Sequence, residues 1–345
     1  MQRAARGLLG ATAVIAALAA WHFADRGATR SEALRDAVLD LDSRAPLRPR
    51  LACEPRVAQF SVLAAGSAPR LDAEARFVWF EAPGPDARRQ LHRIERATRA
   101  LACLTCGEPG NNRRPAPHPT GRAVLFDTDR FASGTRPFDR ELMVLAADGP
   151  LRPSRRLTWD AARDTHALYD PSGLGVVWSR TTLVGRAVRA PIRLGHGSLT
   201  LGGGDVIARG GFAAVRPLAW SADARAFAFA SGSGPFERAS LTDFASGSTR
   251  VLPAASALDA SVSFSADGSL LARAERAAEG RARVWLGETG AAPSEIALGA
   301  ELAAWGAPAG LALAPDGDAF ALAQTREGEE RIVWAELACA RGATP

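Results

Sequence analysis

One stretch of sequence recurs six times along this chain of 345 residues, and it restricts the fold more than any other feature. Its clearest copies are Ser263–Arg273 and Leu311–Ala323, each with an alternating apolar segment, a tight turn containing Asp-Gly and a second apolar segment. Alternation with a period of two predicts a half-buried β-strand, and Asp-Gly between two such runs predicts a hairpin.

Weaker copies of the same pattern end at Phe80, Phe126, Trp178 and Phe229. When the copies are aligned on the turn, the equivalent positions are Glu74, Thr120, Ser172, Asp223, Asp267 and Asp316. Their spacing of 44 to 52 residues, together with the hairpin content, is typical of a propeller or a solenoid. The sequence therefore predicts an all-β protein with a six-bladed β-propeller over residues 51–345.

An apolar residue, an aromatic residue, Ser-Ala-Asp-Gly or Pro-Asp-Gly and then an apolar run resembles the repeat of TolB-like β-propellers. The resemblance covers the chain from about Arg56 to the C-terminus. It implies a non-enzymatic scaffold that binds a protein or peptide partner in the cell envelope. TolB itself has an additional N-terminal α/β domain, and residues 22–50 are too short to form one.

The N-terminus has the features of an export segment. Arg3 and Arg6 precede the apolar run Gly7–Trp21, which predicts a secretory signal over residues 1–21. The alternative is an uncleaved membrane anchor over residues 7–24, although such a run is short for a span of about 20 residues. Either interpretation predicts an exported protein, periplasmic or anchored in the membrane and facing the periplasm.

Residues 22–50 are predicted to be a spacer between the export segment and the propeller. Within it, Thr29 and Glu32 have the spacing of a capping box, and Leu34, Val38 and Leu41 fall on one helical face. A short helix is therefore expected there.

The charge of the chain does not indicate nucleic-acid binding. Its 42 basic residues are all arginine, are spread along the chain and alternate with 37 acidic residues, giving a net charge of +5. Binding of nucleic acid would require a clustered basic face. We therefore expect no nucleic-acid partner, and a monomeric propeller.

Charged and polar residues gather at the connections that enter the predicted inner strands. In a propeller these connections converge at one mouth of the central channel, where arginine could hold a peptide or a carboxylate by two hydrogen bonds. The alternative is a solvated rim whose charges pair with one another. The candidate ligand-binding residues are Asn112, Arg113, Arg114, Arg163, Asp164, His166, Arg216 and Asp259.

Catalytic motifs find little support in the sequence. No serine occupies a Gly-x-Ser-x-Gly motif, and Ser198, which follows His196-Gly197, is expected in a turn. We therefore expect no catalytic residues and no cofactor. The alternative is an enzyme, a hydrolase or a lyase, that uses the channel mouth.

The five histidines do not have metal-binding spacing, so no metal site is expected. His118 occupies the serine position of its repeat, where we expect it to bond the turn backbone. A metal near His118 and His166 would favour the enzyme alternative.

Cys103 and Cys106 form a Cys-x-x-Cys pair, whose spacing fits zinc, thiol exchange or a local disulfide. Zinc would need two further ligands, and the sequence has no second Cys-x-x-Cys. In an oxidising compartment a structural disulfide or an inert pair is expected.

The predicted last blade has too few residues for its outer strand. An open ring would leave sheet edges unpaired, so we predict that Val57–Leu63 pairs with Arg331–Leu337. In this arrangement Cys53 and Cys339 lie close together, and a disulfide between them is expected, the alternative being two unrelated cysteines.

Elsewhere, Asp127–Asp139 and Thr181–Ile192 are predicted to be long insertions. Gly195–Leu201 and Asp205–Arg209 are expected to form the outer hairpin of the third blade.

Overall fold

The computed structural model describes most of the propeller region. The described residues are 54–132, 139–147, 154–159, 162–182, 185–195, 198–209, 215–221, 223–232, 238–252, 261–265, 268–277, 279–289 and 293–339. The predicted export segment, the spacer helix, Cys53 and Asp259 lie outside these residues. No described helix is long and apolar enough to span a membrane.

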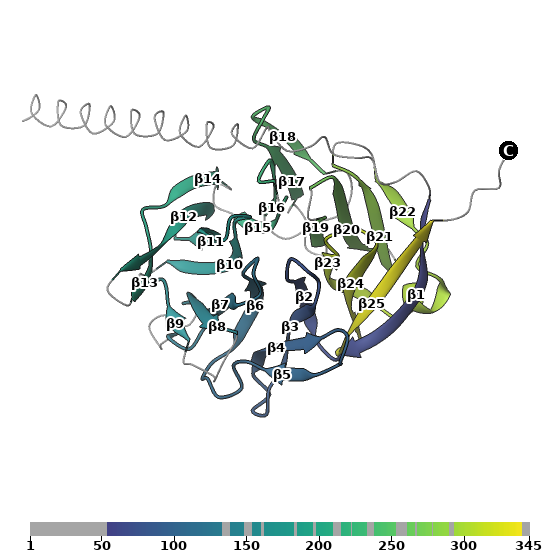
Figure 1. Cartoon of the computed structure of the whole chain (residues 1–345), viewed down its shortest axis with the longest axis horizontal. Coiled ribbons are helices and arrows are strands. Elements are labelled where there is room, and N and C mark those ends of the chain that lie inside the picture. Colours follow the sequence, from purple (N-terminus) through teal and green to yellow (C-terminus); the bar gives the residue numbers. More distant parts are fainter. Residues whose placement is uncertain are drawn as a thin grey trace, which may run out of the picture.

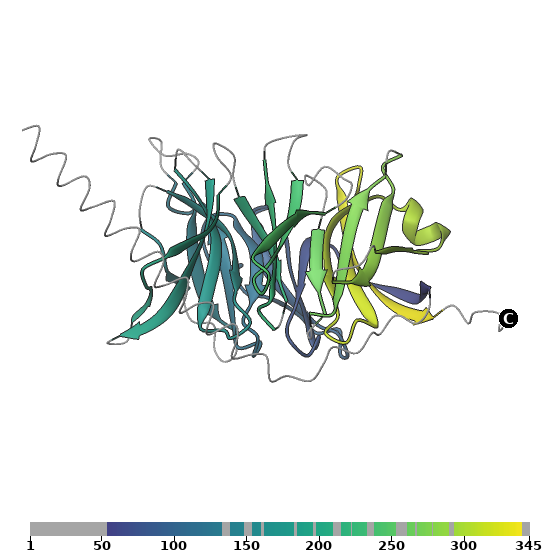
Figure 2. The same ribbon diagram turned by 90° about the horizontal axis from the view of Figure 1, so that it is seen from above.

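Six antiparallel sheets surround a central axis, as Figure 1 shows, and this confirms the predicted six-bladed propeller. Viewed at right angles, the strands run from one face of the ring towards the other (Figure 2). The first three sheets are formed by β2 (Ser67–Leu71), β3 (Phe77–Pro83), β4 (Arg89–Glu95) and β5 (Leu101–Cys103); by β6 (Asn112–Pro117), β7 (Ala123–Thr128), β8 (Glu141–Ala146) and β9 (Arg155–Arg156); and by β10 (Arg163–Tyr169), β11 (Gly175–Thr181), β12 (Gly185–Gly195), β13 (Ser198–Leu201) and β14 (Asp205–Arg209).

The other three sheets follow in chain order. They are formed by β15 (Val215–Trp220), β16 (Ala226–Ser231), β17 (Arg238–Asp243) and β18 (Ser248–Val251); by β19 (Ser261–Phe264), β20 (Leu270–Arg276), β21 (Ala282–Glu288) and β22 (Ser294–Ile296); and by β23 (Ala307–Leu313), β24 (Ala319–Arg326), β25 (Glu329–Cys339) and β1 (Pro55–Ala64). A short helix, α2 (Ala300–Ala304), connects the fifth sheet to the sixth and buries Leu302.

The six inner hairpins share one turn geometry, which is the structural basis of the repeat. In each, a backbone N–H donates to the carbonyl oxygen three residues earlier, at 2.8 to 3.0 Å. The donor residue has a positive φ in all six blades; the donors are Ala75, Gly121, Gly173, Ala224, Gly268 and Gly317. Glycine adopts this backbone conformation without steric cost, so the Asp-Gly signal marks the turns where the sequence fits best.

The ring is closed by the first described strand. β1 pairs with β25 as the outermost strand of the sixth blade, and Phe60 lies opposite Ala335. This is the pairing that the sequence predicts, and in Figure 1 the two ends of the described chain lie side by side there. Pro55, which is two residues after Cys53, lies opposite Cys339. The Cys53–Cys339 disulfide stays a prediction.

The third blade differs from the prediction. Thr181–Ile192 is not an insertion, because most of it is the long strand β12, which pairs with β11 over its first half. Ala187, Val188 and Ala190 of β12 are buried between neighbouring sheets, and this burial stabilises the strand despite its intervening arginines. Both β13 and β14 then pair with β12, rather than forming a hairpin with each other.

The core lies between the faces of adjacent blades. Large side chains that are fully buried there include Trp79, Phe80, Phe126, Phe227 and Phe320. Because each blade packs its aromatic and aliphatic residues on the next, the ring is rigid and fixes the inner strands that surround the axis.

Candidate functional site: the central channel

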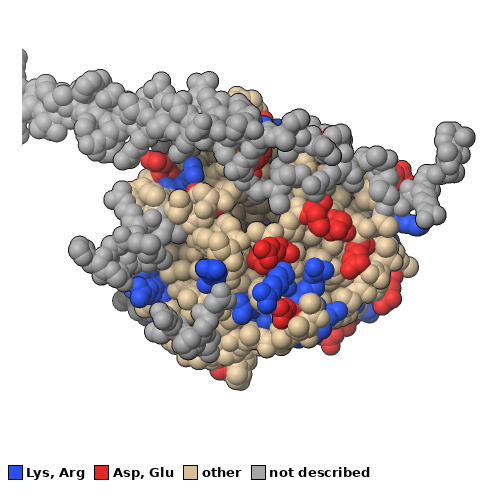
Figure 3. Space-filling model, viewed as in Figure 1, with Lys and Arg blue, Asp and Glu red and all other residues tan. Residues whose placement is uncertain are grey.

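A cavity of about 250 Å³ lies on the axis, between the inner strands of all six blades. Figure 3 shows the molecule hollowed at its centre, with charged side chains around the hollow. Among the described residues that line this cavity, three are arginines and one is a carboxylic acid. These are Arg70, Arg114 and Arg216, and Glu81. His166 completes the charged or titratable part of the wall.

Irregular inner strands place two of these side chains. The pairing of β6 with β7 and of β10 with β11 shifts register immediately around Arg114 and His166. Both residues have a positive φ, 56° and 54°, as does Ala68 at the equivalent place in β2, with 52°. Residues with side chains rarely adopt this region, and bulges of this kind re-aim a side chain next to functional sites. Two of the three equivalent bulges therefore present a basic or titratable side chain to the axis.

The charges in the wall act on one another. Burial, with a smaller contribution from Arg216, lowers the pKa of Arg70 to about 10. Burial also lowers the pKa of His166 well below its ordinary value, and the nearby guanidinium groups of Arg114 and Arg216 add to this effect. The imidazole is therefore neutral at pH 7. Burial raises the pKa of Glu81, against an opposing attraction to Arg114.

Arg114 is partly neutralised by a carboxylate behind the wall. Its Nη1 lies 2.9 Å from both carboxylate oxygens of Asp127, which is fully buried. Asp127 also accepts a hydrogen bond from Arg140 Nη1 at 2.8 Å and one from the backbone N–H of His166 at 3.4 Å. One buried carboxylate thus fixes the inner strands of two neighbouring blades. With Asp127 shared between two arginines, the channel keeps an excess of positive charge.

The structure brings together three of the eight predicted site residues: Arg114, His166 and Arg216 line the cavity. Arg163 is exposed and Arg113 is half-buried, and neither lines it.

Asn112 and Asp164 are fully buried inside the blades instead. Asn112 donates from Nδ2 to Gln90 Oε1 at 2.8 Å, and Asp164 accepts a hydrogen bond from Trp178 Nε1 at 2.9 Å. Asn112 therefore bonds to the neighbouring first blade and Asp164 bonds within its own blade, and neither lines the cavity.

Sequence reasoning missed Arg70 and Glu81. Arg70 lies opposite Trp79 in the first blade, just as Ala116 lies opposite Leu125 and Leu168 opposite Val177 in the next two. An arginine at a position that is otherwise apolar was the signal that an alignment of the inner strands could have provided.

The histidine of the second turn behaves as the sequence predicts. His118 Nδ1 accepts a hydrogen bond from the backbone N–H of Thr120 at 3.2 Å, and its other ring nitrogen lies 3.2 Å from the carbonyl oxygen of Gly173. In the part of the chain that the structure describes, neither His118 nor His166 belongs to a group of three side chains that could hold a metal.

A disulfide joins Cys103 and Cys106, whose Cα atoms are 5.7 Å apart. This agrees with the local bond expected from their spacing.

Comparisons with known proteins agree on the fold. No protein-family model matches the sequence, and neither does any curated protein. Among solved structures, the chain is similar to oligogalacturonate lyase from Vibrio parahaemolyticus (11% identity, TM-score 0.53, covering 82% of this chain and 98% of that one). It is also similar to a putative TolB from Agrobacterium tumefaciens (13% identity, TM-score 0.50, covering 80% of this chain and 90% of that one). A third similar structure is TolB from Acinetobacter baumannii (20%, 0.49), where the match covers 78% of this chain and 55% of that one. These similarities show the fold alone, a β-propeller.

Proposed function

We propose that the chain is an exported, non-enzymatic scaffold, and that its channel binds an anionic group of a protein or peptide partner in the cell envelope. The observation that carries this proposal is the wall of the cavity, with Arg70, Arg114 and Arg216 facing one carboxylic acid, Glu81. Buried cationic groups that repel each other are stabilised by an anion placed between them. A carboxylate fits best, because arginine holds it by two parallel hydrogen bonds.

The size of the cavity favours a side chain or a chain terminus over a larger ligand. Small-molecule sites usually enclose about 300–1,000 Å³, and the channel encloses about 250 Å³. A glutamate or aspartate side chain, or the C-terminal carboxylate of a peptide, is therefore the group that we propose enters it. The rest of the partner would then lie on the face around the mouth.

The enzyme alternative gains no specific support from the site. The structural similarity to a lyase is at 11% identity, which supports a common fold only. His166 is the one imidazole among the described lining residues of the channel. Ser261 and Glu81 also line the channel, but among the described residues the hydrogen bonds of His166 go to Asp127 and Thr165 rather than to either of them. A non-enzymatic role is the simpler proposal.

Export is supported by the N-terminal sequence, where Arg3 and Arg6 precede an apolar run. Mass spectrometry of the mature protein should show a start near Ala20 if the segment is a cleaved signal. An intact Met1 in the membrane fraction would select the anchor, and an intact Met1 in a soluble cytoplasmic fraction would reject export.

Capture from the cell-envelope fraction tests the binding role. The wild-type chain should retain one or a few proteins, and a double variant with Arg70→Gln and Arg216→Gln should lose them. Arg238→Gln removes a charge from an exposed position in β17, outside the cavity wall, and should retain them. Equal capture by all three folded proteins would reject the channel as the binding site.

A further inference from the structure

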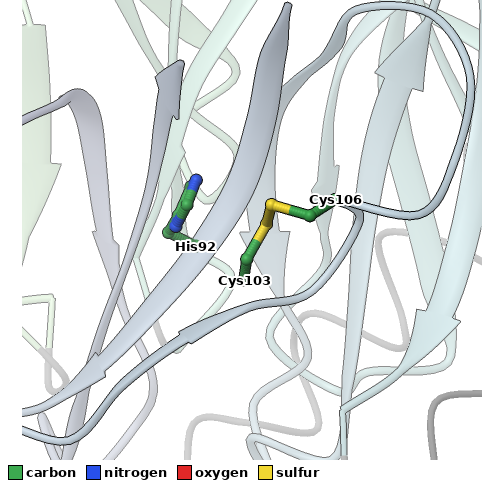
Figure 4. A group of neighbouring side chains, drawn as sticks. All are labelled: His92, Cys103 and Cys106. Carbon is green, nitrogen blue, oxygen red and sulfur yellow. A yellow bond between two sulfur atoms is a disulfide. The ribbon is translucent and has the colours of Figure 1, made fainter. Parts of the chain in front are cut away.

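A second chemical cluster lies on the first blade, away from the channel. It consists of His92, Cys103 and Cys106, whose ligand atoms all lie within 4.8 Å of one another. Figure 4 shows the imidazole on one strand and the two sulfurs on the neighbouring strand and the loop after it. This is the one such group among the described residues.

Strand register brings the cluster together. His92 of β4 lies directly opposite Cys103 of β5, so the two side chains project from the same face of the sheet. On its other side His92 lies opposite Phe80 of β3, and the two rings stack with centroids 5.5 Å apart. The stacked phenyl ring thus holds the imidazole beside the sulfurs.

One buried nitrogen of this cluster has no hydrogen-bond partner among the described residues. This atom is Nε2 of His92. A buried nitrogen without a partner costs about 1–3 kcal/mol, so it calls for a role.

We propose that Cys103, Cys106 and His92 form a binding site for zinc or a similar soft divalent cation, which is open when the disulfide is reduced and closed when it is oxidised. Two thiolates and an imidazole are ligands that zinc prefers, and three protein ligands leave its fourth position open. Zinc binds sulfur at about 2.3 Å and nitrogen at about 2.0–2.1 Å. The two sulfurs move apart when the disulfide is reduced, and the imidazole nitrogen, within 4.8 Å of them, needs to approach by only about 1 Å to share one ion with them.

The chemistry of the switch balances. A dithiol reductant reduces the Cys103–Cys106 bond to two thiols and itself becomes a disulfide. The cation then displaces the two thiol protons to solvent, while a ring nitrogen of His92 donates its lone pair. Two thiolates offset the two positive charges of the ion, so the loaded site is neutral, as suits a half-buried position.

A groove reaches the histidine of the cluster. His92 and Leu101 line a groove of about 760 Å³ between β1 and the first blade, which is otherwise mostly apolar. Such a groove could admit both the reductant and the ion. The chain contains no second Cys-x-x-Cys to complete a zinc site, but the third ligand comes from the strand paired with Cys103 rather than from a nearby sequence position.

Metal titration of the full chain tests the proposal. One sample is reduced with a phosphine, desalted under nitrogen and titrated with zinc against a chromophoric chelator; the other stays oxidised. We expect one tightly bound zinc per reduced chain and none per oxidised chain. Cobalt in place of zinc should produce a thiolate-to-cobalt charge-transfer band only in the reduced sample.

Three variants assign the ligands. Cys53→Ser with Cys339→Ser removes the other thiols and should leave the reduced stoichiometry at one. Cys103→Ser with Cys106→Ser should abolish zinc binding. If the Cys53→Ser, Cys339→Ser variant does not fold, the Cys103→Ser, Cys106→Ser variant is compared directly with the wild-type chain. His92→Phe keeps a ring against Phe80 and should weaken zinc binding at least about tenfold, the lower end of what losing even a supporting group costs.

Unchanged zinc affinity in a folded His92→Phe variant would overturn the proposed ligand set. Absence of zinc binding by the reduced wild-type chain, or equal binding by the oxidised chain, would overturn the site itself.

Discussion

Arg114 of β6 and Asp127 of β7 form a bifurcated contact behind the channel wall, with Arg114 Nη1 2.9 Å from both carboxylate oxygens. Arg114 is about a quarter exposed, whereas Asp127 is fully buried. The pair therefore connects the channel wall to the packed interior of the second blade. The stability of the blade therefore depends on Arg114, because the buried carboxylate of Asp127 is stabilised by the cations beside it.

Replacing Asp127 tests this coupling. Asp127→Asn should destabilise the fold by about 3–5 kcal/mol, since breaking a buried pair leaves Arg114 without this carboxylate and Arg140 with only Asp129, 3.6 Å away. Chemical denaturation measures the free energy of unfolding. The control is Asp86→Asn, whose partner Arg88 lies 3.5 Å away with both side chains about half exposed, and which should change stability by less than about 0.5 kcal/mol. Similar losses in the two variants would contradict the assigned role of Asp127.

His166 should make stability depend on pH. Its pKa is lowered well below 6.5 in the folded chain, chiefly by burial and then by Arg114 and Arg216. Below about pH 6.5 the unfolded chain therefore binds a proton that the folded chain does not, and the free energy of unfolding falls as the pH falls.

Denaturation at pH 7.5 and 5.5 checks this dependence. Wild type should lose stability between the two conditions, and His166→Gln should lose less, because glutamine does not titrate. Glu81, with its raised pKa, acts in the opposite direction, and because it is present in both chains its effect cancels when the two are compared. A variant that loses as much stability as wild type would exclude His166 as the cause.

The ring closure leads to a prediction about Cys53 and Cys339. Because Pro55 lies opposite Cys339, a disulfide at this edge would join the two ends of the propeller. The chain-entropy account assigns about 5–6 kcal/mol to closing so long a loop, and about 2 kcal/mol to the short loop between Cys103 and Cys106.

Peptide mapping without reduction should recover a peptide that joins Cys53 to Cys339. Cys53→Ser should lower the melting temperature more than Cys103→Ser does, since it opens the longer loop. Recovery of both cysteines as thiols, under conditions where Cys103 and Cys106 are bonded, would show that the ring closes through strand pairing alone.

The fold could be predicted because its signals are local. Each inner hairpin has its own turn, and the turn positions of Gly268 and Gly317 have the positive φ that their Asp-Gly signal indicates. The pairing of β1 with β25 could be predicted because an open ring would leave a sheet edge of the last blade unpaired. The third blade was predicted less well, since Pro191 and the arginines of β12 hide a strand that depends on burial against neighbouring blades.

The site was harder to predict because its members meet only in three dimensions. Arg114, His166 and Arg216 lie on three inner strands and were found by their repeat positions. Glu81 comes from the second strand of the first blade. In the separate cysteine cluster, cross-strand register places His92 beside Cys103. Burial and register of this kind do not appear in the spacing of residues along the chain.

The affinity of the captured partner for channel variants tests the central claim most directly. Losing a hydrogen bond to a charged group costs about 1.5–3 kcal/mol. Arg70→Gln and Arg216→Gln should therefore each raise the dissociation constant by about tenfold or more, while Arg238→Gln changes it less than about twofold. The claim would be contradicted if the two channel variants, folded and with unchanged melting temperatures, bound the partner as tightly as the wild-type chain.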